Sequence, residues 1–534
     1  MKNEGSVSVV PLFAPLLLLT FFFVWPSDAP DKTELAHVVL ARAMVEHGTF
    51  RVNDAVQTAP TTLGIVTVEG DMFTTEAPGL AWLSVPFVGM AKVVSWLRGT
   101  ELRYPSLLWW LRLVLVQLPA VGFGFWLHAA LERRQVSQRA SRFAILVLMA
   151  TWPLLVGAQV LWAEGLAAMW WVVAMTVLSE PDDWPSPQRF GVAGVIVGVA
   201  LTTTYSLWWL LVPTGIYALS RARQPRWSVA FFVPVGAALA LVLGYHTLCY
   251  GGPFEFPGLS SLMHWSLSSA YRLWSDPTYG LVWLAPIWLI ALLGFAVMLA
   301  RGEVGVALAS LFAALWFAGG ANVEGQAPFA LVRAALPLVV VLVWPLARAT
   351  EALGSLFGAS TVMGVLAAYS IAIAGLASPY AQFFSRDLVN PLRDISWFVW
   401  RDGVVPSGLG HMLGFPADRA LWPFWLILAL VAFVAGAAGD GSEDGGTWRR
   451  RVAVMALGLT AFWGRLATAP LKKTDTTFEA AVQVERQLGG ENRFSLRASS
   501  AAGSDKGLAE GQSATALGRQ QHALDAYKQY LKNR

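Results

Sequence analysis

Apolar segments long enough to cross a bilayer recur along most of the chain, and this repetition limits its fold more than any other feature. A transmembrane helix needs roughly 20 apolar residues, and only helices and closed barrels satisfy their backbone groups inside lipid. Hydrophobic residues make up 56% of the 534 and charged residues only 13%, against about 25% charged in soluble domains. The sequence therefore predicts an all-α polytopic membrane protein of about 12–14 helices.

The hydropathy pattern places the membrane domain at residues 1–468 and leaves 469–534 as a small polar, partly helical tail. We expect 7–25 to be an uncleaved first span, with a signal peptide cleaved after Ala29 as the alternative. Its span length and the Pro30 that follows favour the uncleaved form. The predicted spans are 7–25, 106–131, 143–161, 163–179, 190–204 with 206–220, 228–248, 279–300, 304–318, 333–347, 359–378, 421–437 and 452–468.

Basic residues in short loops predict the orientation of the spans, because such loops stay in the cytoplasm. The basic residues that fit one side together are Arg133, Arg134, Arg139, Arg142, Arg221, Arg223, Arg226, Arg301, Arg348 and Arg449–Arg451. The outward connections are then a large first loop at 26–77, further loops at 249–278, 319–332 and 379–420, and the C-terminal tail.

The apolar segment 79–97 conflicts with this orientation if it crosses the membrane. With the N-terminus inside, a complete span at 79–97 would put Arg133 and Arg134 outside. We expect 79–97 to be a juxtamembrane or re-entrant helix. The alternative is that 190–220 forms one long span, which would reverse every later segment.

The first outward loop is too apolar and too regular for disorder. Leu35, Val38, Val39, Arg42 and Val45 recur at helical spacing, and Gly48 then ends the helix as a C-cap. The segment 66–71 is predicted to be a short strand that enters a turn. A loop of this length with its own structure is typical of a functional region.

Four acidic residues are predicted at the outer ends of spans, where charge is costly and is kept for function or pairing. They are Asp31, Glu34, Glu76 and Glu164. Apolar surroundings raise the basicity of a carboxylate, so that it can take a proton from an acceptor hydroxyl. A structural alternative stands beside this hypothesis, since Asp31 also suits a helix N-cap and Glu34 the first helical turn.

Outward arginines are candidates for binding a phosphate, because a guanidinium matches its oxygens. Arg333 and Arg272 are the candidates, Arg333 the better one because no acid follows Glu324 before it. The arginines of 379–420 alternate with acids and are predicted to form local ion pairs.

No cofactor is predicted from the sequence. The histidines lack metal-ligand spacing, so a divalent metal is unsupported, and the single Cys249 excludes a cysteine metal cluster. A formal charge of +4 does not indicate nucleic acid. Walker A and GxSxG motifs are absent from the sequence, which leaves ATP-driven transport and the familiar hydrolase chemistry unsupported.

Several stretches, taken in order, resemble bacterial membrane glycosyltransferases of the GT-C superfamily, the group of aminoarabinose and protein mannosyl transferases. The match extends over roughly 1–430. The stretches are AMVEHGTF at 43–50, EGDMFTTEAPG at 69–79, QVLWAE at 159–164, YGGPFE at 250–255 with TYGL at 278–281, and VRAALP at 332–337.

The resemblance implies a GT-C-like fold in the bacterial inner membrane and inverting sugar transfer. Its donor would be a polyprenyl-phosphate sugar, and its acceptor an extracytoplasmic lipid, glycan or protein. The catalytic base falls on Glu34 or Asp31, with Glu76 and Glu164 in support. The chain lacks the usual Asp-Glu pair or lone Asp after the first span, so the choice between Asp31 and Glu34 stays open.

The alternative function is a lipid-carrier transporter or a non-catalytic membrane partner in an envelope polysaccharide system. Transporters carry mid-span charges and internal repeats, and neither is clear in this sequence. The tail resembles part of one tetratricopeptide unit near Ala516–Tyr527. A lone partial repeat cannot bury its own face, so we expect a docking helix for a protein partner.

Overall fold

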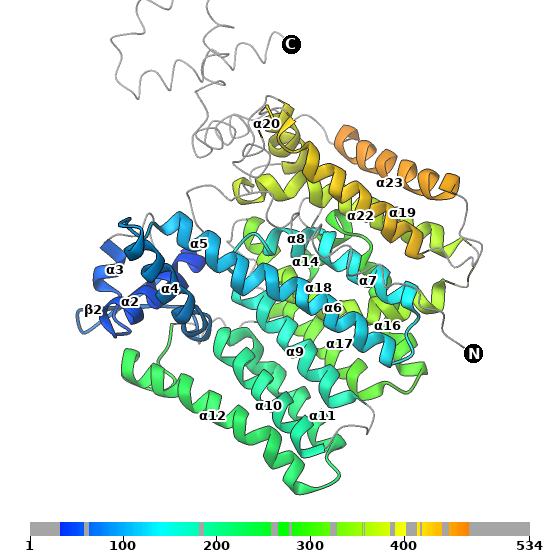
Figure 1. Cartoon of the computed structure of the whole chain (residues 1–534). Coiled ribbons are helices and arrows are strands. Elements are labelled where there is room, and N and C mark those ends of the chain that lie inside the picture. Colours follow the sequence, from blue (N-terminus) through cyan, green and yellow to red (C-terminus); the bar gives the residue numbers. More distant parts are fainter. Residues whose placement is uncertain are drawn as a thin grey trace, which may run out of the picture.

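The computed structural model shows a bundle of apolar helices with a small group of elements at one end (Figure 1). Five of the described helices are long and apolar enough to cross a membrane, and several shorter apolar helices accompany them. The predicted all-α membrane-type fold is confirmed. The described residues are 32–57, 64–180, 186–257, 265–276, 280–320, 328–354, 356, 358–384, 390–401, 414–416, 419–439 and 448–468. The predicted span 7–25, Asp31 and the tail 469–534 lie outside them.

The first outward loop has the predicted order of elements. Helix α2 (Lys32–His47) is followed by α3 (Asn53–Gln57), the hairpin of β1 (Ile65–Val68) and β2 (Asp71–Thr74), and α4 (Gly79–Leu97). Gly48 has a φ of +65°, and its N–H bonds the Met44 carbonyl at 3.1 Å, so the predicted C-cap is confirmed. The strands pair antiparallel with Val68 opposite Asp71, which confirms the strand and turn predicted at 66–71.

The bundle follows the predicted spans closely. Helix α9 spans Ala163–Ser179 and therefore matches the prediction at both ends. The other helical elements are α5 (Tyr104–Arg112), η1 (Leu113–Gln117), α6 (Leu118–Arg133), α7 (Gln138–Ala150), α8 (Trp152–Gly157), α10 (Ser186–Thr203), η2 (Tyr205–Leu210), α11 (Leu211–Arg221), α12 (Pro225–Tyr250), α14 (Leu267–Ser275), α15 (Leu281–Leu284), α16 (Trp288–Ala300), α17 (Val304–Gly320), α18 (Pro328–Leu353), α19 (Ala359–Ala377), η3 (Ser378–Phe383), η4 (Leu392–Trp397), α20 (Phe398–Arg401), α22 (Trp422–Gly439) and α23 (Trp448–Thr468).

Two segments predicted as single spans are broken. The segment 143–161 divides into α7 and α8 at Thr151, which has extended backbone angles just before the Trp152–Pro153 start of α8. The segment 279–300 divides at Ala285, which precedes Pro286 and also leaves the helical region. Because a proline disfavours helix in the residue before it, Pro286 accounts for the second break.

Helix α18 is the central element of the bundle. Of its most apolar window, 89% is buried, and it packs against α7, α8, α9, α16 and α17. Gly294 of α16 lies directly on the backbone of Pro345 in α18, so that a side chain there would collide with main-chain atoms. This close approach fixes the distance between the two helices.

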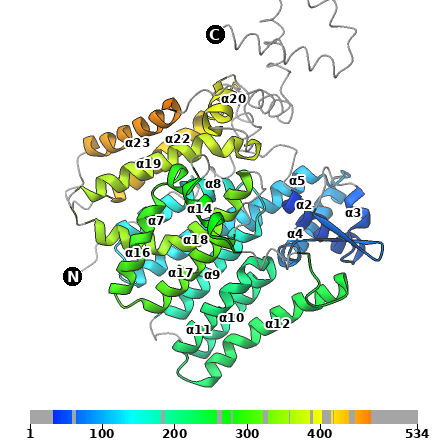
Figure 2. The same ribbon diagram turned by 180° about the vertical axis from the view of Figure 1, so that it is seen from behind.

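Helix α12 lies along the edge of the bundle beside α10, with the group α2–α4 near its end (Figure 2). Its apolar window is only 22% buried inside the protein, so most of its surface is available to lipid. Helix α4 packs on α2, α10 and α5 and has the length and apolarity of a span. Our expectation that it does not cross the membrane stays a prediction.

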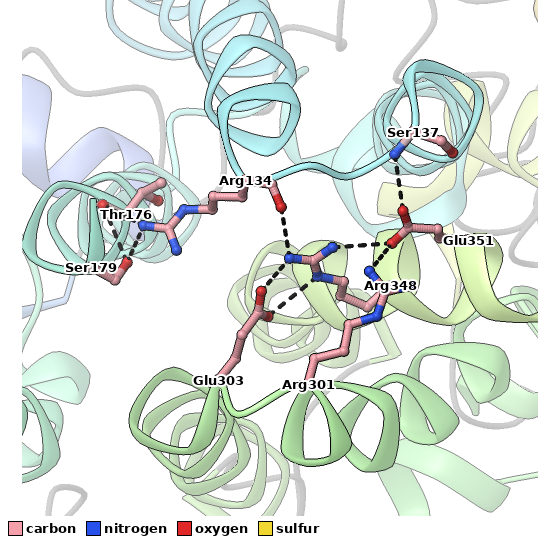
Figure 3. A network of polar contacts seen from close by, with 8 residues as sticks. All are labelled: Arg134, Ser137, Thr176, Ser179, Arg301, Glu303, Arg348 and Glu351. Atoms are coloured by element: carbon pink, nitrogen blue, oxygen red, sulfur yellow. Dashed lines mark hydrogen bonds and ion pairs between the residues drawn. The ribbon is translucent and has the colours of Figure 1, made fainter. Parts of the chain in front are cut away.

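Three of the basic segments predicted to share one side lie together, those of Arg134, Arg301 and Arg348. Arg348 donates to both Glu303 and Glu351 and to the Arg134 carbonyl, and Arg301 also bonds Glu351 (Figure 3). The Ser137 N–H reaches the other oxygen of Glu351 at 3.3 Å. This basic-end network (Arg134, Ser137, Arg301, Glu303, Arg348 and Glu351) joins the C-terminal part of α18 to the α6–α7 and α16–α17 connections at one end of the bundle. Its assignment to the cytoplasm stays a prediction from the charge pattern.

The close approach of α16 and α18 gives a test of the fold. We expect Gly294→Ala to lower the free energy of unfolding of the purified protein by about 1–3 kcal/mol, because the added methyl group forces two helix backbones apart. Gly236→Ala in α12 is the matched control, since no atom lies within 4 Å of the added carbon. Thermal unfolding in detergent measures both variants. Equal midpoints for the two would contradict the packing described here.

Candidate functional site

Arg333, near the start of α18, contacts three segments that are distant in sequence. Its Nε donates to Glu164 Oε1 at 2.7 Å, and its Nη2 contacts both that oxygen and Glu76 Oε2, the latter at 3.3 Å. Its Nη1 donates to Thr33 Oγ1 at 2.7 Å. These four residues form the acid–arginine cluster. It lies about 22 Å from the basic-end network, since Arg333 and Arg348 are fifteen residues apart on one helix.

Local structure explains how each acid reaches Arg333. Glu164 lies in the first turn of α9, where the unpaired N–H groups favour a negative charge. Glu76 follows β2 and precedes α4, whose Gly79 lies so close to Thr202 of α10 that a larger residue would not fit. The chain is thus held on both sides of Glu76.

The end of α12 holds the hairpin in place. The Tyr250 hydroxyl donates to the Thr74 carbonyl at 2.6 Å, and its ring packs edge-on against Phe73. Tyr245 packs in the same way against Phe50 and Trp82, on the two sides of the hairpin in sequence. Since Thr74 is two residues before Glu76, these contacts determine where the Glu76 carboxylate can lie.

Glu34 is in a different environment from the other acids. Its two carboxylate oxygens accept from Arg112 Nε and Nη2 at 2.5 Å each, and Oε1 also accepts from the Leu161 N–H at 2.8 Å. Its side chain is 0% exposed. A carboxylate that is buried and bonded on both oxygens is not placed to meet an acceptor hydroxyl. This geometry favours a structural role, in which the pair ties α2 to α5 and to the turn before α9.

The three described acids differ in their exposure and in their contacts with arginine. Arg112 binds Glu34, and Arg333 binds both Glu76 and Glu164. Glu76 makes the longest contact with arginine, and its side chain is 25% exposed, against 12% for Glu164. Glu76 is therefore the most accessible of the three and the best placed to receive a proton.

The structure does not bring every predicted site residue to this cluster. Arg272 is exposed in the last turn of α14, and within the described part of the chain no ion pair joins it to Glu34, Glu76 or Glu164. Asp31 lies outside the described residues, so its predicted role stays a prediction. Within the described ranges, no group of three or more His, Cys, Asp or Glu could hold a metal ion.

Three residues of the site were not predicted: Arg112, Thr33 and His37. Arg112 had a usable signal, because it lies within the predicted span 106–131 and a charge inside a span needs a partner. Thr33 had no such signal. His37 is buried, and burial lowers its pKa to about 4, with the Glu164 carboxylate opposing that effect and Arg333 adding to it. It is neutral at pH 7.

Comparison with known proteins gives one structural similarity to report. No protein-family model matches the chain, and no curated protein sequence matches it. The chain is similar to the crystal structure of ArnT from Cupriavidus metallidurans bound to undecaprenyl phosphate. The TM-score is 0.49 at 14% sequence identity, over 96% of this chain and 82% of that chain. Because both the identity and the TM-score are low, no residue role is transferred from it.

The Glu34–Arg112 pair predicts a large effect on stability. Glu34→Gln leaves the Arg112 charge buried beside a neutral partner, so we expect a loss of about 3–5 kcal/mol. Glu46→Gln is the control, because its pair with Arg42 is partly exposed and within one helix, and such pairs contribute about 0.5 kcal/mol. Thermal unfolding of the purified proteins gives the comparison. The double variant Glu34→Gln/Arg112→Met should recover part of the loss, and a single variant as stable as Glu46→Gln would contradict a structural role.

Proposed function

We propose that this protein is a membrane glycosyltransferase that moves a sugar from a polyprenyl-phosphate donor to an extracytoplasmic acceptor hydroxyl. One observation carries the proposal: two acids from separate segments, Glu76 and Glu164, meet at one guanidinium at the end of a bundle of apolar helices. Such a site suits a lipid-linked phosphate, whose prenyl chain would lie in the membrane. The sequence motifs that resemble GT-C enzymes support the same reaction class.

The proposed reaction needs one proton acceptor and one group that binds the departing phosphate. The acceptor oxygen attacks the anomeric carbon of the donor sugar and loses its proton to a carboxylate. The bond between that carbon and the phosphate oxygen breaks, and its electron pair leaves with the polyprenyl phosphate. Attack from the face opposite the leaving group inverts the anomeric carbon.

Among the described acids we assign the proton acceptor to Glu76. It is the most exposed of the three and has the weakest contact with an arginine. The resemblance placed this role on Asp31 or Glu34. Glu34 is occupied by Arg112, whereas Asp31 remains the candidate that the family pattern names. Both Glu76 and Asp31 therefore belong in the test.

Arg333 is the proposed binding group for the phosphate of the donor. A phosphate oxygen suits Nη2, where the contact with Glu76 is the longest of the cluster at 3.3 Å. Glu164 and Thr33 hold the remaining edges of the guanidinium. In this arrangement, binding of the donor displaces Glu76 from Arg333, and the same event provides the negative charge that replaces it. Arg272 is not needed for this step.

The site and setting support the wider parts of the proposal. The many apolar helices fit a multi-pass protein of the bacterial inner membrane, with the acid–arginine cluster on the extracytoplasmic side, as the basic loops predict. The tail 469–534 remains a proposed docking segment for a protein partner. A lipid-carrier transporter or a non-catalytic partner is the alternative, and a transfer assay separates it from the enzyme.

Transfer by the purified protein in vesicles tests the proposal. The donors are a panel of radiolabelled undecaprenyl-phosphate sugars, and the acceptor is an envelope lipid extract. We expect Glu76→Gln to lower kcat by about 10²–10⁴-fold, the usual contribution of a general base. Arg333→Gln should mainly raise the KM for the donor. Glu69→Gln, an exposed residue in the turn of the same hairpin, is the control and should retain activity.

The outcomes separate the candidates for the base. Full activity in Glu76→Gln together with its loss in Asp31→Asn would move the base to Asp31. Full activity in both variants and in their double variant would remove the base from the first outward loop. Absence of transfer with every donor, together with donor binding that depends on Arg333, would favour the lipid-carrier transporter.

A further inference from the structure

His37 lies beside the acid–arginine cluster but is not explained by it. It follows Thr33 by four residues and Glu34 by three on α2, and these spacings put side chains on the same side of a helix. Thr33 contacts Arg333, and Glu34 contacts the turn before α9. Only 1% of His37 is exposed. The ring is therefore buried on the side of α2 that faces Arg333 and the turn before α9.

Three buried polar atoms in this place have no hydrogen-bond partner among the described residues. They are both ring nitrogens of His37 and Oε2 of Glu164. A buried polar atom without a partner is costly, and native proteins nearly always pair such atoms with protein groups or with ordered water. The two residues also interact electrostatically, since the Glu164 carboxylate raises the pKa of His37 against the larger lowering by burial.

The charge state of His37 defines what it can bind. Its pKa of about 4 makes it neutral over the working range of most proteins, so one ring nitrogen donates a hydrogen bond and the other accepts. Glu164 Oε2 is an acceptor only. A group that joins the two must therefore accept from the ring N–H and donate to the carboxylate, which is what an O–H group does. Two possible ligands are too few for a structural metal site.

We propose that His37 and Glu164 Oε2 share one buried water molecule, and that His37 thereby acts as a positioning residue for the acid–arginine cluster. The ring N–H donates to the water, and the water donates to Oε2. Glu164 is then held from both sides, with Oε1 on Arg333 and Oε2 on the water. The orientation of Arg333, and with it the affinity for a phosphate, depends on this second contact.

The tautomer of His37 tests the shared water without any activity measurement. The protein is labelled with ¹⁵N in its histidine rings, placed in vesicles and compared with His37→Gln, which identifies the His37 signals by difference. We expect a single neutral tautomer at pH 7, with a cross-peak from its N–H to water, and a mixture of tautomers in Glu164→Leu. Two tautomers in the unaltered protein, or a ring that Glu164→Leu leaves unchanged, would overturn the proposal.

Kinetics test the positioning role, and this part rests on the proposed function. His37→Phe fills the space without a donor and should raise the KM for the donor lipid about tenfold, the effect of one lost hydrogen bond to a charged group, with a smaller change in kcat. His37→Gln keeps an N–H donor and should restore most of the affinity. His47→Gln, at the exposed end of the same helix, is the control.

The tautomer experiment and the kinetic experiment can each overturn the proposal independently of the other. If the protein transfers no sugar, the proposed function is wrong, while the tautomer still decides whether His37 and Glu164 share a water. If His37→Phe and His37→Gln give the same KM as the unaltered protein, the positioning role is wrong even though sugar transfer stands. Equal loss of folded protein in both variants, with unchanged KM in the folded fraction, would assign His37 to packing alone and would also overturn the proposal.

Discussion

The cost of placing charge among apolar helices governs this structure, and α18 shows it most clearly. A charged side chain in such surroundings persists only when it is paired or faces water. Helix α18 is buried along most of its length, and it has an arginine near each end. Arg348 is held by Glu303, Glu351 and a backbone carbonyl, whereas Arg333 is held by Glu76, Glu164 and Thr33. The buried helix thus brings together loops at both ends of the bundle.

Two arginines near the first outward loop, the buried Arg112 and the half-buried Arg333, have different chemical capacities. Arg112 and Glu34 satisfy each other, since every carboxylate oxygen is bonded and no part of the acid is exposed. Arg333 is shared between two acids, one of them at a longer distance and partly exposed. In the proposed reaction, the carboxylate of this second arrangement exchanges partners when the donor binds. The fully bonded pair therefore suits a structural role, whereas the shared guanidinium of Arg333 suits the candidate site.

Much of the fold could be predicted from the sequence because its signals are local. The length of α9, the Gly48 cap and the 66–71 strand and turn each depend on neighbouring residues. Pairing across the bundle could not be predicted in the same way. Glu34 and Arg112 are 78 residues apart, and Glu164 and Arg333 are 169 apart. Sequence spacing suggested that Arg333 was free of acids, whereas in space it contacts two.

The hydrogen bond from Tyr250 to Thr74 links the membrane to the site. Only 22% of the apolar window of α12 is buried inside the protein, and its last residue is bonded to the strand that leads to Glu76. A helix of this kind tilts when the hydrocarbon thickness changes. Such a tilt would reach the segment that positions the carboxylate through the Tyr250 hydroxyl and the ring contacts of Tyr245 and Tyr250. Lipid chain length would then act on the spacing between Glu76 and Arg333, with no ligand involved.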